Sequence, residues 1–187
     1  MGTSKNVGSP DSPPWKFSLA ILGRVDVPAD RQNQEIWRSA EADRGPRLAD
    51  EFSHPVLAAA CELASTARDV RKTLVAYENH LSDTHKSGFA VEIARRALAR
   101  AVSSQQGSQG FACELFAEAT SYYASRDLPS FVGSKGRVET ISAAAELKFQ
   151  LKETTRTIVQ SVGPPIVNPD GWGSYVRKVL AGLRGSR

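Results

Sequence analysis

Residues 60–81 read ACELASTARDVRKTLVAYENHL, and their apolar side chains recur with the spacing of a helix. The recurring positions, three and four residues apart in alternation, are Ala60, Leu63, Ala67, Val70, Leu74, Tyr77 and Leu81. Such a heptad seam is typical of a helix packed along its length against another helix. We therefore expect one long helix that begins at the N-cap Ser53 and packs inside a bundle. The alternative is a homo-oligomer that pairs two chains through the same seam.

Further helical patterns follow Gly88. They cover roughly 89–104, 111–125 and 140–162, and a last helix follows Asn168. Thr140 and Asn168 are good N-cap residues, and Pro169 suits the first position of a helix. In the helix from 140, spacing predicts an inward face made of Ile141, Ala144, Leu147, Leu151, Ile158 and Val162. The sequence thus predicts an all-α bundle of about five helices over 53–187.

The first 52 residues differ from the rest. Residues 1–14 are rich in Gly, Ser and Pro, and we expect them to be disordered. Residues 15–27 alternate between apolar and polar side chains, which predicts an extended arm or short strand packed on the bundle. Alternatively, the arm adds a strand to a sheet of a partner protein. The candidate partner-binding residues are Trp15, Phe17, Leu19 and Ile21. Residues 30–44 predict a polar helix with Ile36 and Trp37 as its apolar anchors.

Composition limits the classes of protein to consider. The chain has 187 residues and a net charge of +4, and no apolar run approaches the ~20 residues that span a bilayer. Its only cysteines, Cys61 and Cys113, lie in apolar helical patterns and are expected to act as small hydrophobic side chains. A disulfide framework is therefore not expected, which favours the reducing cytoplasm.

Known catalytic and metal-binding patterns do not match. The histidines are His54, His80 and His85, and they form no zinc-binding spacing with each other or with the cysteines. Residues 125–137, SRDLPSFVGSKGR, contain glycines around a lysine, but the order differs from that of a nucleotide-binding P-loop. The loop is either a backbone nest for an anion or a turn that leads into the next helix. We expect no metal and no cofactor.

Positive charge is concentrated at the C-terminal end. Residues 135–187 carry nine Lys or Arg and four Asp or Glu, whereas residues 1–134 carry 15 and 16. This asymmetry favours a polyanionic or acidic partner, although a solvated basic surface gives the same pattern. The candidate basic face consists of Lys135, Arg137, Lys148, Lys152, Arg156, Arg177, Lys178 and Arg184.

These observations favour a non-enzymatic helical adaptor or accessory subunit of a larger assembly. It would bind a protein partner and present the basic face to nucleic acid or to an acidic protein surface. One alternative is a stand-alone protein that binds nucleic acid without sequence preference, which would bind less tightly as salt increases. A second alternative is an enzyme whose site is assembled from residues scattered along the chain.

Overall fold

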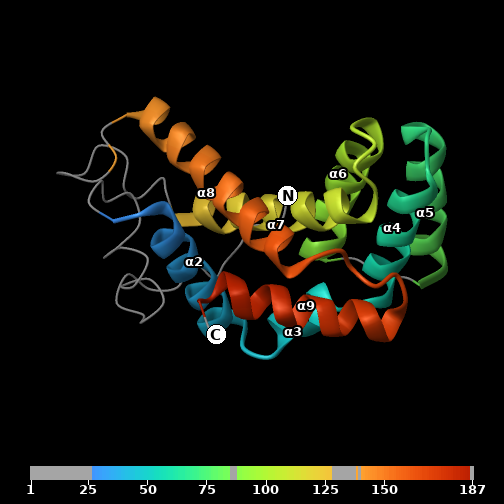
Figure 1. Cartoon of the computed structure of the whole chain (residues 1–187), viewed down its shortest axis with the longest axis horizontal. Coiled ribbons are helices and arrows are strands. Elements are labelled where there is room, and N and C mark those ends of the chain that lie inside the picture. The colour runs from blue at the N-terminus through green and yellow to red at the C-terminus, as the bar shows by residue number, and fades with distance from the viewer. Residues whose placement is uncertain (1–26, 85–87, 128–137, 139, 186–187) are drawn as a thin grey trace.

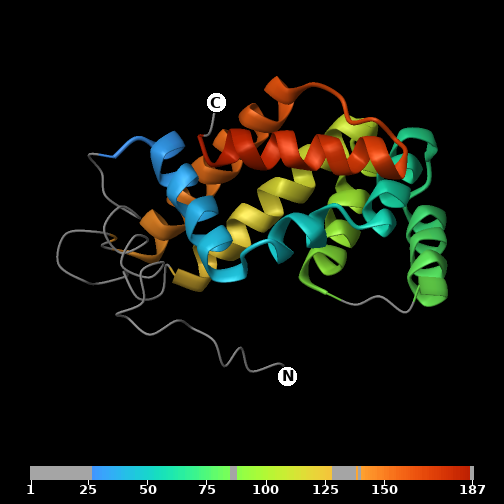
Figure 2. The same ribbon diagram turned by 90° about the horizontal axis from the view of Figure 1, so that it is seen from below.

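The computed structural model describes residues 27–84, 88–127, 138 and 140–185, and these form an all-α bundle. The helices, in chain order, are α2 (Ala29–Arg44), α3 (Arg47–Phe52), α4 (Pro55–Thr66), α5 (Val70–Thr84), α6 (Phe89–Ser103), α7 (Gly107–Asp127), α8 (Ile141–Val162) and α9 (Pro169–Leu183). Figures 1 and 2 show them in two perpendicular views. No helix in this part of the chain combines the length and the apolar character that crossing a bilayer requires.

Helix α7 is the centre of the bundle. Every residue from 110 to 120 is buried, because α6 and α8 pack along it while α4 and α2 cover further faces. The sequence of this stretch, GFACELFAEAT, is rich in small side chains, which lets neighbouring helices approach on all sides. A helix buried all round has no single apolar stripe. The buried surface therefore extends around the helix, while Tyr122 near its C-terminal end is 43% exposed.

Several local predictions are confirmed. The predicted polar helix is α2, and its anchors Ile36 and Trp37 are both buried. The N-cap side chain of Thr140 accepts a hydrogen bond from the backbone N–H of Ala143 at 3.1 Å. Asn168 does the same for the backbone N–H of Gly171 at 2.7 Å. These capping bonds satisfy backbone donors that the first helical turn leaves unpaired.

The single long helix predicted from Ser53 is wrong. The chain forms α4 and α5 instead, and Ala67 between them has an extended backbone, with ψ at 147°. Asp69 explains the break, because its side chain accepts a hydrogen bond from the backbone N–H of Lys72 at 3.0 Å and so starts a new helix. The N-cap of α4 is His54, one residue after the predicted position. Region 53–187 therefore holds α4 to α9, more helices than the predicted five.

The seam residues nevertheless pack inside the chain. Ala60 and Tyr77 are fully buried, and the other five seam residues are partly buried against the same core. Apolar side chains keep their inward direction on both sides of the break, because α4 and α5 pack against each other and against α6. The homo-oligomer through this seam stays a prediction.

A buried row of hydrogen-bonded polar side chains joins α2, α7 and α8. The indole N–H of Trp37 donates to Thr120 Oγ1 at 2.9 Å, and the hydroxyls of Thr120 and Thr155 lie 2.8 Å apart. Thr155 also donates to Asn33 Oδ1 at 3.1 Å. Buried polar groups strongly favour the arrangement that satisfies them, so these contacts set the register of the three helices.

The two halves of α8 have different surroundings. Its C-terminal half lies on α7, whereas its N-terminal end extends to one edge of the molecule (Figure 1). Ile141 is 81% exposed, so its predicted inward direction is wrong. Helical spacing places Ile141 on the same side as the buried Val159, but no element among the described residues covers this first turn. The arm predicted at 15–27, apart from Val27, and the segment at 1–14 that was predicted to be disordered lie outside the described residues.

Candidate functional site

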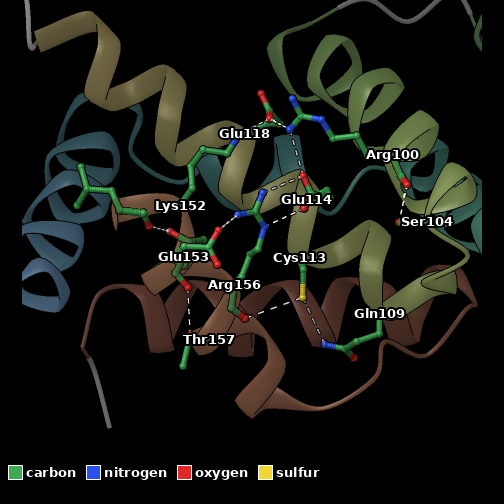
Figure 3. Close-up of polar contacts among 12 residues, drawn as sticks. Arg100, Ser104, Gln109, Cys113, Glu114, Glu118, Lys152, Glu153, Arg156 and Thr157 are labelled. Carbon is green, nitrogen blue, oxygen red and sulfur yellow. Dashed lines mark hydrogen bonds and ion pairs between the residues drawn. The ribbon is translucent and has the colours of Figure 1, made fainter. Parts of the chain in front are cut away.

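The main cluster of charged side chains lies between α6, α7 and α8 (Figure 3). We call it the charge network, and it consists of Arg100, Glu114, Glu118, Lys152 and Arg156. Lys152 Nζ lies 2.6 Å from Glu118 Oε1. Arg156 makes a two-pronged contact with Glu114, with Nε and Nη2 at 2.8 and 3.2 Å from the two carboxylate oxygens. Arg100 on α6 contacts both glutamates, at 3.1 Å for Glu114 Oε2.

The positions of these residues follow from helix geometry. Glu114 and Glu118 are four residues apart on α7, and Lys152 and Arg156 are four residues apart on α8. Residues four apart lie on one face of a helix, so two acidic side chains face two basic ones. Both glutamates are nearly buried, with side chains 11% exposed. Charges this far from water need partners, and the three cations supply them.

The network controls the ionisation of both glutamates. Partial burial by itself raises the pKa of Glu114, but hydrogen bonds and charge from Arg156 and Arg100 outweigh it and leave the pKa below its ordinary value. Burial also raises the pKa of Glu118, and Lys152 together with Arg100 reverses that shift. Both side chains are therefore carboxylates at neutral pH. They act as fixed acceptors, not as general acids.

Beside the network lies an open cleft of about 480 Å³, which we call the α7–α8 cleft. Its lining residues are Gln106, Gln109, Gly110, Cys113, Glu114, Glu153, Arg156 and Gln160. Three of them are glutamines, whose carboxamides both donate and accept hydrogen bonds. Gly110 is required here, since a Cβ at this position would lie 2.2 Å from Gln106 Cβ. Arg156, paired with Glu114 and Glu153, forms a charged end to this polar groove.

One buried acceptor of the cleft is unsatisfied. Gln109 Oε1 makes no hydrogen bond of normal geometry among the described residues. The hydroxyl of Tyr175 interacts with the Gln109 side chain, although it too makes no hydrogen bond of normal geometry within this part of the chain. The Gln109 amide nitrogen contacts Cys113 Sγ at 3.8 Å, which leaves the carbonyl oxygen as the remaining polar atom. An unsatisfied buried carbonyl costs free energy, so a donor that reached it would be favoured.

The cysteines do not have the chemistry of nucleophiles. Both are buried and free, as the sequence predicted from their apolar neighbours. Burial raises the pKa of Cys61 to about 12, and burial also raises the pKa of Cys113 despite its contact with Gln109. Both are therefore thiols at neutral pH, whereas nucleophilic attack needs a thiolate. Among the described residues, no cluster of three His, Cys, Asp or Glu side chains is arranged to hold a metal ion.

The ion pairs turn the predicted basic residues toward different neighbours. Lys152 and Arg156 contact α7, while Arg184, the C-cap residue of α9, pairs with Glu41 of α2. Arg177 is exposed and donates to Ser174 on its own helix at 3.1 Å. Lys178 is exposed and Lys148 is half-buried. Residues 125–127 of the predicted loop belong to α7. The rest of that loop, with Lys135 and Arg137, lies outside the described residues, and so do the four partner-binding candidates Trp15, Phe17, Leu19 and Ile21. Binding by these sets stays a prediction.

The sequence alone did not reveal the acidic half of the network. Glu114 and Glu118 interrupt an otherwise apolar helix, and the matching four-residue spacing of Lys152 and Arg156 was the available signal. Two opposite pairs with the same spacing indicate facing helices, but spacing does not say which helices are neighbours. Gln109 and Gln160 carried no signal, because isolated glutamines are common on helix surfaces.

Comparison with known proteins gives no relative: no protein-family model, no curated protein and no solved structure matches this chain.

Proposed function

We propose that this protein is a non-enzymatic helical adaptor that binds an extended segment of a partner protein in the α7–α8 cleft. The observation that carries the proposal is the composition of the cleft, in which the carboxamides of Gln106, Gln109 and Gln160 surround an open groove of about 480 Å³. Peptide backbones present alternating N–H and C=O groups, and carboxamides pair with both. The volume lies in the range of roughly 300–1,000 Å³ that is typical of ligand sites.

The charge network supports this function by holding the walls of the cleft in place. Glu114 belongs both to the cleft and to the network, and its carboxylate is fixed by Arg156 and Arg100. A groove whose walls are already ordered loses little conformational entropy when it binds a segment. Because Cys113 is protonated and both network glutamates are ionised, the cleft offers hydrogen bonds and charge for recognition.

The alternative of nucleic-acid binding through the predicted basic face has less support. Lys152, Arg156 and Arg184 each pair with a glutamate of another helix. A phosphate that bound these cations would have to compete with carboxylates that are already in place. Nucleic-acid binding would therefore depend on Lys148, Arg177 and Lys178 among the described residues, together with Lys135 and Arg137.

The experiment is site-specific photo-crosslinking in cells. A photoreactive amino acid replaces Gln160 at the cleft, and the matched control replaces Gln150, an exposed glutamine on the same helix that bonds to Glu146. We expect position 160 to yield a distinct protein adduct and position 150 to yield none. The adduct should disappear when Gln109→Leu removes the buried acceptor, while the melting temperature stays within a few degrees of the wild type.

The partner identified in this way is then titrated in purified form. Gln109→Leu combined with Gln160→Ala should weaken binding at least tenfold, and Gln150→Ala should leave binding unchanged. The same adducts at positions 160 and 150 would contradict a partner site in the cleft. An affinity that is unchanged in the double variant would contradict it as well.

A further inference from the structure

The N-terminal half of α8 exposes an apolar stripe. Ile141, Ala145 and Phe149 are spaced four residues apart and therefore lie on one side of the helix. Ile141 is 81% exposed, Phe149 is 58% exposed, and Ala145 is also exposed. We call these three residues the α8 stripe. Single exposed apolar residues are ordinary, but an aligned set on one helix face marks a contact surface.

The stripe is too small to hold two separate molecules together. Stable protein interfaces bury roughly 1,200–2,000 Å², and two large side chains with one alanine supply a small part of that area. A segment tethered to the same chain needs less buried area to bind, because its effective concentration is on the order of millimolar. The size of the stripe therefore favours an occupant from the same chain over a second copy.

The chain that precedes α2 begins at the same end of the molecule as the stripe. Thr155 of α8 contacts Asn33 of α2 at 3.1 Å, so the two helices touch at this point. Ala29 lies four residues before Asn33 and Phe149 lies six before Thr155, which correspond to about 6 Å and about 9 Å of helix. Both views place the start of α2 and the start of α8 at the same end of the molecule (Figures 1 and 2).

The preceding segment also has the required length and pattern. Seven residues, 22–28, separate Ile21 from α2, and an extended chain of seven residues spans up to roughly 23 Å. This reach exceeds the sum of the two helical paths from the contact point. In an extended segment, side chains at every second position share one side. If residues 15–21 are extended, as their alternation predicts, Trp15, Phe17, Leu19 and Ile21 would lie in one row.

We propose that residues 15–21 of this chain dock on the α8 stripe, with their apolar row facing Ile141, Ala145 and Phe149. The docked segment removes the stripe from water and explains why spacing in the sequence assigns Ile141 an inward direction. This surface is separate from the α7–α8 cleft, so the docking holds or fails independently of the proposed function.

Disulfide trapping in the purified full-length chain tests this docking. The variant Leu19→Cys with Ala145→Cys places a thiol on each partner, while the native cysteines are buried and unreactive. We expect an intramolecular disulfide whose yield is independent of protein concentration. The control pairs Leu19→Cys with Thr157→Cys, an exposed position on the C-terminal half of α8, and should form it at least tenfold more slowly. A yield equal to the control would overturn the docking, as would a 145–145 link between two chains that rises with concentration.

Proteolysis provides a second test that leaves residues 15–21 intact. Trypsin cleaves after Lys16, which the docked segment would shield. Phe149→Ser should increase the cleavage rate at Lys16 at least tenfold, whereas Val75→Ser, at a position of similar exposure on α5, should leave the rate unchanged. Because both substituted side chains are exposed in the described structure, the variants are expected to fold. An unchanged rate in Phe149→Ser would contradict the docking.

Discussion

The two halves of α8 have the same kind of amphipathic sequence and opposite surroundings. In the C-terminal half, Leu151, Thr155 and Val159 are completely buried against the other helices. In the N-terminal half, Ile141, which lies about five helical turns before Val159 and therefore on the same side, is mostly exposed. Periodicity defines which side of a helix is apolar, but the presence of a covering element depends on the rest of the fold. An apolar stripe on a helix therefore predicts that another element packs on it, but it does not say which element does so.

The polar contacts of α8 also differ between its buried and exposed sides. Lys152 lies in the packed half and is only 17% exposed, because Glu118 of α7 receives its ammonium group. Gln150, one turn away from Glu146, hydrogen-bonds to it on the helix surface. The first contact joins two helices, whereas the second lies within one helix and is open to water. Buried pairs of this kind have a larger effect on stability than exposed ones, since removing one partner leaves a charge without compensation.

The largest expected difference comes from the core side of α8. Leu151→Ala should lower the free energy of unfolding by about 2–5 kcal/mol, because it leaves a cavity where a fully buried side chain was. The exposed neighbour Gln150 provides the control, and Gln150→Ala should change stability by less than about 0.5 kcal/mol. Chemical denaturation measures both. Equal losses in the two variants would mean that the C-terminal half is not packed as described.

The charge network should give a smaller, pH-dependent effect. Glu118→Gln should lower the free energy of unfolding by about 1–3 kcal/mol at pH 7, because Lys152 and Arg100 lose their carboxylate. The folded-state pKa of Glu118 is below its ordinary value, so its contribution is present above the unfolded pKa and disappears as pH falls through the folded pKa. The difference between variant and wild type should therefore narrow below about pH 4.

Denaturation curves measured from pH 7 to pH 2 check this expectation. The control is Glu146→Gln, which changes an exposed carboxylate on the same bundle and should have little effect at any pH. A gap between Glu118→Gln and the wild type that stays constant over this range would show that the carboxylate is not stabilised by its neighbours.

The smallest expected effect is at the exposed start of α8. Thr140→Ala removes the side-chain acceptor for the backbone N–H of Ala143 and should cost about 1 kcal/mol. Thr157→Ala, at an exposed position in the packed half, should cost less than about 0.5 kcal/mol. Hydrogen exchange should show that the stability lost in Thr140→Ala is concentrated in the first turns of α8. A loss spread evenly over the helix would mean that its two halves unfold as one unit.

Much of the local structure could be predicted from residues. Thr140 and Asn168 start helices because their side chains bond to the first turn, and Gly163 follows the end of α8 with a positive φ of 90°. The break between α4 and α5 had a signal as well, since Asp69 is a strong N-cap residue. The heptad seam outweighed it in the prediction, because apolar spacing continues across a break when both helices face one core.

The candidate site could be predicted only in part. Lys152 and Arg156 were predicted as part of the basic face, but their acidic partners were not predicted. Glu114 and Glu118 lie 34 or more residues away along the chain from the cations of α8. Contacts over such separations depend on how helices are arranged, which the periodicity of one helix does not encode. The cleft carboxamides come from α7, the turn before it and α8, and they gave no pattern within any one of these segments.

By itself, the sequence determined the class of the fold, the start and end of most helices and the inward direction of most apolar side chains. Hydrogen bonds within one turn and helical spacing decide these features, and both act over a few residues. Only the tertiary structure decided that α7 is central, that its glutamates neutralise the cations of α8, and that one half of α8 is covered while the other exposes Ile141. Those outcomes depend on which faces meet, because burial and charge pairing are properties of several helices together.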